Sequence, residues 1–73
     1  MKQYNVGVFP EQGKNNVKYT AYTKMYNNNW WDCIEVPVFA ESGVEAKKFA
    51  IRAVKTFDIY KKRVQQILKG RKK

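Results

Sequence analysis

Few residues in this 73-residue chain could carry out catalysis. It has no histidine, so the usual general base at neutral pH and the commonest metal ligand are both missing. Its six carboxylates are scattered, and its one cysteine, Cys33, is expected to be a small packing residue. The four glycines are isolated, which excludes a phosphate-binding loop of the Walker or dinucleotide type. The sequence therefore predicts a protein that is not an enzyme and that needs neither a metal nor a cofactor.

The charge of the chain indicates an acidic partner. Fifteen Lys and Arg residues against six Asp and Glu give a formal net charge of +9, which attracts polyanions over a long range. Nucleic acid is the commonest such partner, and we expect DNA ahead of RNA. The alternative is that the excess charge only keeps the protein in solution. An anionic membrane is not expected, because the apolar stripe that could lie on it is needed for the core.

Cations and aromatic rings alternate along residues 17–26, where Lys18, Tyr22, Lys24 and Tyr26 share one face of a predicted strand. Rings can stack on bases while lysines neutralise phosphates, so this sheet face is the favoured binding face. The alternative is that tyrosines pack well on a pleated surface and that lysines keep it solvated.

Other candidate contacts lie on the predicted helix and at the start of the predicted third strand. Adjacent tryptophans in a strand point to opposite faces, so one of Trp30 and Trp31 can be exposed as an interface anchor. The helix cations could contact a phosphate backbone without reading sequence, or could form an ordinary solvated face. Ile51 and Ile59 on the same side could mark a dimer contact. The candidate nucleic-acid-binding residues are Lys18, Tyr22, Lys24, Tyr26, Trp30, Lys48, Arg52, Lys55, Lys62 and Arg71.

Three strands are predicted from alternating polarity. The first covers about residues 3–8 and ends at the turn signals of residues 10–13, and the second covers residues 17–26. Three asparagines at 27–29 suit a turn before a third strand at about residues 30–39. Pro37 favours an edge position for that third strand.

One helix is predicted after the strands. Ser42 is the expected N-cap, and Glu45, three residues later, completes a capping box. Apolar residues then recur every three or four positions, at Ala46, Phe49, Ala50, Ala53, Phe57, Tyr60, Val64, Ile67 and Leu68. Residues 61–68 could instead form a fourth strand. The predicted fold class is α+β, a three-stranded antiparallel meander with one long C-terminal helix on one face (β-β-β-α), as a single domain over residues 1–69 with a basic tail at 70–73.

No apolar segment near the amino terminus is long enough for a signal peptide or a membrane span. A single cysteine cannot form an intramolecular disulfide, which is typical of a reducing compartment. We therefore expect a cytoplasmic protein, in the host cytoplasm if the chain is encoded by a phage. Whether it is a monomer or a homodimer stays open.

Residues 38–50, with the sequence VFAESGVEAKKFA, form the junction between the third strand and the helix. This segment resembles the strand-to-helix junction of the plant AP2 domain and of the integrase arm-binding domains, which lay a three-stranded sheet in the DNA major groove. The resemblance implies a DNA-binding domain whose outward sheet residues contact the bases. Residues 47–50 are also similar to the last helix of the double-stranded RNA-binding domain, whose first helix has no counterpart here.

The small, basic chain without catalytic groups generally looks like an accessory protein of a phage or mobile element. That likeness implies a second hypothesis, a modulator that docks on an acidic surface of a host protein. In that case Trp30 or Trp31 would be the anchor and the lysines would steer the encounter.

Overall fold

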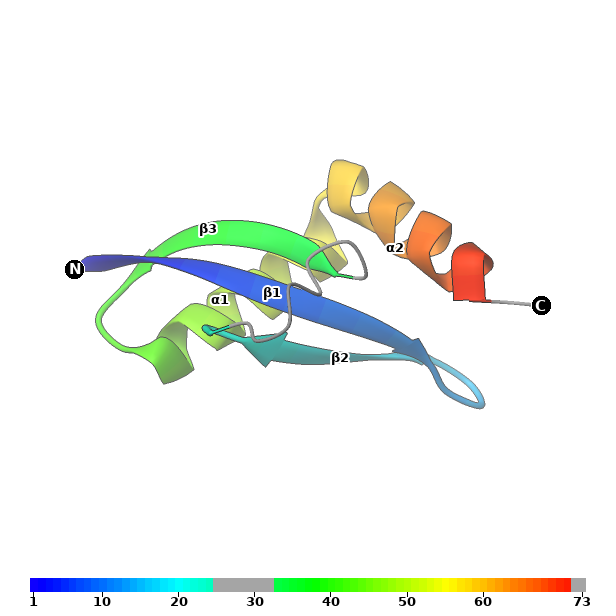
Figure 1. Ribbon diagram of the computed structural model, residues 1–73, viewed down its shortest axis with the longest axis horizontal. Coiled ribbons are helices and arrows are strands. Elements are labelled where there is room, and N and C mark those ends of the chain that lie inside the picture. Colours follow the sequence, from blue (N-terminus) through cyan, green and yellow to red (C-terminus); the bar gives the residue numbers. More distant parts are fainter. Residues whose placement is uncertain (25–32, 72–73) are drawn as a thin grey trace.

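The computed structural model describes residues 1–24 and 33–71, with side chains as far as residue 70. The fold class is α+β, as predicted. Strands β1 (Lys2–Gln12), β2 (Val17–Tyr22) and β3 (Ile34–Ala40) form one antiparallel sheet, followed by helices α1 (Gly43–Thr56) and α2 (Asp58–Arg71). Helix α1 lies across one face of the sheet (Figure 1), and α2 packs against α1, β1 and β3.

The strand order differs from the predicted meander. The order is β2-β1-β3, so the first strand and not the second occupies the centre. β1 is the longest strand, and its Val6 and Val8 are completely buried, as expected of a central strand. At Gly7 the register pairs β1 with Tyr22 of β2 on one side and with Glu35 of β3 on the other.

The two prolines lie where only one neighbouring strand pairs. Pro37 is in β3, an edge strand as its proline predicted. The turn signal at Pro10 was placed too early, because β1 continues to Gln12 and Pro10 pairs with Tyr19 of β2. Pairing with β3 ends at Val8, so β1 is an edge strand by the time it reaches Pro10. The chain turns after Gly13, whose N–H donates to the Asn16 carbonyl at 2.7 Å.

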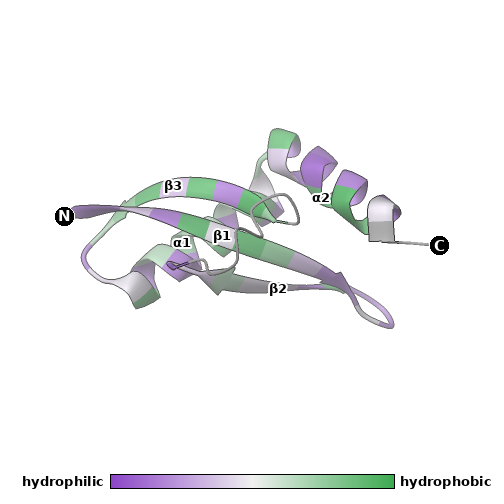
Figure 2. Ribbon diagram, in the orientation of Figure 1, coloured by the Kyte–Doolittle hydropathy of each residue, from purple (hydrophilic) through white to green (hydrophobic). Residues whose placement is uncertain are grey.

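The predicted alternation of faces is confirmed in β2 and β3. Val17, Tyr19 and Ala21 face the core, whereas Lys18, Thr20 and Tyr22 are exposed. β2 ends at Tyr22, before the predicted end at Tyr26, and Lys24 lies in a bend. β3 begins at Ile34 instead of Trp30, and its core-facing residues are Ile34, Val36 and Val38 as predicted. Figure 2 shows the resulting alternation of hydrophobic and hydrophilic residues along β3.

The predicted cap of α1 is confirmed. The Ser42 hydroxyl oxygen accepts a hydrogen bond from the Glu45 N–H at 3.2 Å. The Glu45 carboxylate accepts one from the backbone N–H of Glu41 at 3.2 Å, one residue before the N–H that completes a standard capping box. Together the two bonds fix the direction in which α1 leaves the sheet.

Removing the cap should measurably destabilise the domain. We expect Ser42→Ala to lower the free energy of unfolding by about 1 kcal/mol in a urea melt, because the N–H of Glu45 loses its acceptor. Ser42→Asp, which keeps a side-chain acceptor, is the control and should retain most of that stability. Equal stability of wild type and Ser42→Ala would show that this bond contributes nothing to the fold.

The single long helix predicted from the apolar stripe is wrong, because the helix breaks at Phe57. This residue is extended, with φ −83° and ψ 130°. Its N–H donates to the Ala53 carbonyl at 2.9 Å, and its own carbonyl accepts from Tyr60 and Lys61 at 3.1 and 3.0 Å. The same residue thus ends α1 and begins α2. The alternative of a fourth strand at residues 61–68 is excluded, since they lie within α2.

The break has a simple packing reason. The 14 residues of α1 span about 21 Å, close to the roughly 23 Å of the seven residues of β3. A continuous helix would carry its last turns past the end of β3. After the break Val64 and Ile67 are 2% and 7% exposed and join the core.

The core lies between the sheet and the two helices. Its members are Val6, Val8, Ala21, Ile34, Val36, Ala40, Ala46, Ala50, Val54, Val64 and Ile67. The buried line of α1 is Ala46, Ala50 and Val54, at four-residue spacing, and Val54 was missing from the predicted stripe. Phe49 and Phe57 were predicted in that stripe but are exposed. No helix in the described part of the chain is long and apolar enough to cross a membrane.

Candidate nucleic-acid interface

The positive charge of the protein is concentrated on its helices. In residues 1–24 and 33–42, four lysines are nearly balanced by three acids, Glu11, Glu35 and Glu41. Helices α1 and α2 contain only two acids, Glu45 and Asp58, and Glu45 serves as part of the α1 cap. The nine Lys and Arg residues of the helices are Lys47, Lys48, Arg52, Lys55, Lys61, Lys62, Arg63, Lys69 and Arg71.

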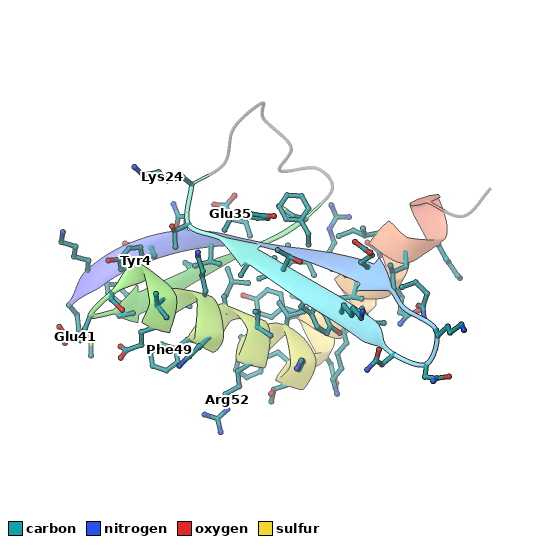
Figure 3. All side chains as sticks on the ribbon, turned by 90° about the horizontal axis from the view of Figure 1, so that it is seen from below. Tyr4, Lys24, Glu35, Glu41, Phe49 and Arg52 are labelled. Atoms are coloured by element: carbon teal, nitrogen blue, oxygen red, sulfur yellow. The ribbon has the colours of Figure 1, made fainter. Side chains whose placement is uncertain are left out.

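The open face of the sheet, on which the sequence favoured binding, is close to neutral in the described residues. Lys18 is exposed and pairs across the strands with Glu11. Tyr22 is 47% exposed, and its ring meets the Phe9 ring edge to face, with centroids 5.6 Å apart. Glu35 lies with Lys24 on the side of the sheet away from α1 (Figure 3). Tyr26, Trp30 and Trp31 lie outside the described residues.

The predicted helix contacts lie on exposed surfaces of both helices. Lys48, Arg52 and Lys55 follow one another at spacings of four and three along α1, so they lie on the same side of it. Arg52 points away from the sheet (Figure 3). Lys62 is exposed on α2, and Arg71 is the last residue of that helix.

A groove of about 360 Å³ brings two of these cations together with residues that the sequence did not single out. We call it the lysine groove, and it is lined by Tyr19, Lys55, Lys61, Lys62, Val64 and Gln65. The Lys55 ammonium lies 5.6 Å from the centre of the Tyr19 ring, a cation–π contact that holds the long side chain at the edge of β2. Three lysines from two helices therefore line one groove.

A second groove, of about 300 Å³, lies along α1. We call it the phenylalanine groove, and its lining residues are Phe49, Arg52, Ala53, Thr56 and Phe57. Phe49 and Phe57 are 43% and 56% exposed, and the Phe57 ring lies 6.1 Å from the Tyr60 ring. The sequence assigned both phenylalanines to the core because their spacing suits an apolar stripe. The groove therefore combines two accessible rings with a guanidinium group.

A third pocket, of about 550 Å³, lies between the start of β3 and α2. Cys33 contributes to its lining but is only 3% exposed, so its thiol is a packing group there. Among residues 1–24 and 33–70, no three His, Cys, Asp or Glu side chains gather closely enough to hold a metal ion.

Each of the two helix grooves therefore combines cationic side chains with aromatic rings, Tyr19 in the lysine groove and Phe49 and Phe57 in the phenylalanine groove. Comparisons of the chain with protein-family models, with curated proteins and with solved structures found no match.

Proposed function

We propose that this protein binds nucleic acid, DNA ahead of RNA, through the exposed surface of α1 and α2. The observation that supports this function best is the segregation of charge, since nine cations and only two acids lie on the helices while the strands are nearly balanced. A field of one sign over one surface attracts and orients a polyanion, whereas scattered charges of both signs do not.

The lysine groove gives this surface a defined phosphate site. Lys55, Lys61 and Lys62 reach it from two helices, so a phosphate there is contacted from more than one direction. Lys48 and Arg52 continue the positive surface along α1. Contacts of this kind position a nucleic acid and raise affinity without selecting a sequence.

Neighbouring groups on the sheet make it a less suitable binding face than the helices. On the sheet, Lys18 has Glu11 as its cross-strand neighbour, and an acid close to a phosphate contact opposes binding. Tyr22 already packs against Phe9, so its ring is less available to a base. In the lysine groove, Lys55 lies over the Tyr19 ring, and the described lining residues include no acid.

A salt titration tests the proposed function. If Lys48, Arg52, Lys55, Lys61 and Lys62 each neutralise one phosphate, the logarithm of affinity for duplex DNA should fall with the logarithm of salt concentration at a slope of about −4.5. Affinity should then drop roughly 500-fold between about 50 and about 200 mM salt. Fluorescence anisotropy with a labelled duplex measures this, and duplex RNA of the same length tests the preference for DNA. A flat response, or no binding at low salt, would exclude the proposal.

A second candidate function is docking on an acidic surface of a host protein, as a phage modulator would. The observation that favours it is the exposure of large apolar side chains on the helices, with Ile59 75% exposed and Phe57 56% exposed. This function predicts no binding to duplex DNA even at low salt, so the same titration separates the two candidates.

A further inference from the structure

The two exposed phenylalanines of α1 need an explanation beyond phosphate binding. Phe49 and Phe57 are large apolar side chains that a small domain would gain stability by burying. The core is instead formed by Ala46, Ala50 and Val54 of the same helix, which leaves both rings on its accessible side. They line one groove with Arg52, and Figure 3 shows Phe49 and Arg52 directed away from the sheet.

The spacing of the rings limits what can occupy the groove. Phe57 stands eight positions after Phe49, about 12 Å along the axis of α1. Neighbouring bases in a stacked strand are only about 3.4 Å apart, so they are too close to fill two positions about 12 Å apart. Ala53 and Thr56 are small and leave the space between the rings open. The groove therefore suits two bases of a strand that is extended between them.

Arg52 lies between the rings in sequence and lines the same groove. Its planar guanidinium can bond a phosphate or stack on a base. Lys48 and Lys55 flank it on the same side of α1. Lysine is depleted in the cores of protein–protein interfaces. Aromatic rings surrounded by lysines therefore fit a polyanion with accessible base faces better than they fit the surface of a protein partner.

From these observations we propose that the phenylalanine groove binds unpaired bases of single-stranded nucleic acid by stacking them on Phe49 and Phe57. A duplex cannot use the groove in this way, because its base faces are covered by their neighbours in the stack. The inference depends on the proposed nucleic-acid-binding function and extends it by naming the strand form that this part of the surface prefers.

The test compares single-stranded and duplex DNA. Phe49→Ala and Phe57→Ala should each weaken binding of a labelled oligo-dT of about 20 nucleotides by about 5-fold to 100-fold, the usual effect of removing one stacking ring. Affinity for a duplex of the same length should change by less than about 2-fold, because phosphate contacts dominate there. The salt slope for oligo-dT should stay unchanged, since no charge is removed.

Phe39→Ala is the matched control. Phe39 is 63% exposed, at least as accessible as the two groove residues, but it lies on β3. It should bind both DNA forms like wild type, with folding of every variant checked by circular dichroism. Phe57 also joins the two helices, so if its variant is misfolded, Phe49→Ala decides the result.

The outcomes separate the two proposals. If Phe49→Ala and Phe57→Ala bind oligo-dT like wild type while duplex binding persists, base stacking in the groove is excluded. A protein partner is then the remaining explanation for the two exposed rings. Equal losses in Phe39→Ala would also exclude it. If neither DNA form binds wild type at low salt, the proposed function fails and the stacking site fails with it.

Discussion

Replacing Lys48, Arg52, Lys55 and Lys62 together with glutamine is expected to reduce affinity for duplex DNA roughly 4,000-fold at about 0.1 M salt. Each phosphate contact contributes about 0.9 to the slope of log affinity against log salt, so four lost contacts reduce the slope by about 3.6. Near 0.1 M salt that slope difference corresponds to between three and four decades of affinity. Anisotropy titrations at four salt concentrations measure both the slope and the affinity.

The matched control removes the same charge from the strands and their connections. Lys2, Lys14, Lys18 and Lys24 are all exposed, and their replacement by glutamine lowers the net charge by the same four units. We expect a small loss of affinity from the weaker overall field and little change in slope. Equal losses in the two variants would mean that net charge alone drives binding. A larger loss of affinity in the strand variant would indicate that DNA binds to the sheet and not to the helices.

The features that the sequence predicted well are those with local causes. The alternation of β2 and β3 depends on neighbouring residues, because the side-chain period of a strand is two. The cap depends on Ser42 and Glu45, which are three residues apart in the chain and bonded in the structure. Pro37 predicted an edge strand because it has no N–H to donate to a second neighbour.

The strand order could not be predicted in the same way. Alternation shows which side of a strand is buried, but it does not show which strands are neighbours. The central position of β1 depends on its pairing with β3, more than 25 residues away at every pair of the register. A meander was the simpler expectation because consecutive strands are often adjacent. The length of β1 and its buried valines mark it as the central strand in the structure, whereas the sequence predicted a shorter first strand at about residues 3–8.

The helix break also has a tertiary cause. No glycine or proline interrupts residues 44–69, so local propensity allows one continuous helix. The chain changes direction at Phe57, where α1 has already matched the length of β3, and the core gains Val64 and Ile67 from α2. Asp58, an acid at the start of α2, was the local sign of a new helix amino terminus.

The candidate site follows from that break. The sequence named Lys55 and Lys62 as cations of one helix face. Lys55 contacts Tyr19 from α1, and Lys62 lines the same groove from α2, after the change of direction at Phe57. The break also leaves Phe57 exposed beside Arg52. The residue types at the interface were therefore predictable, whereas the two grooves were not.

Val54→Ala is expected to lower the free energy of unfolding by about 2 kcal/mol, from the lost burial of two methyl groups and the cavity they leave. Val54 is 0% exposed and belongs to the core. A domain of this length is expected to be stable by only about 4 to 11 kcal/mol in total. The loss should lower the melting temperature by roughly 10 °C, measured by circular dichroism with a urea melt alongside.

Val44→Ala makes the same substitution in the same helix at a residue that is 66% exposed. It should leave stability unchanged or raise it slightly, because alanine is the better helix former and little burial is lost. The two valine variants together also test which side of α1 is buried. If Phe49 and Phe57 formed the buried stripe that the sequence predicted, Val54 would lie outside it, and both valine variants would be near neutral. We expect only Val54→Ala to lose stability, because Ala46, Ala50 and Val54 form the buried side of α1. The same packing leaves the phenylalanine groove open.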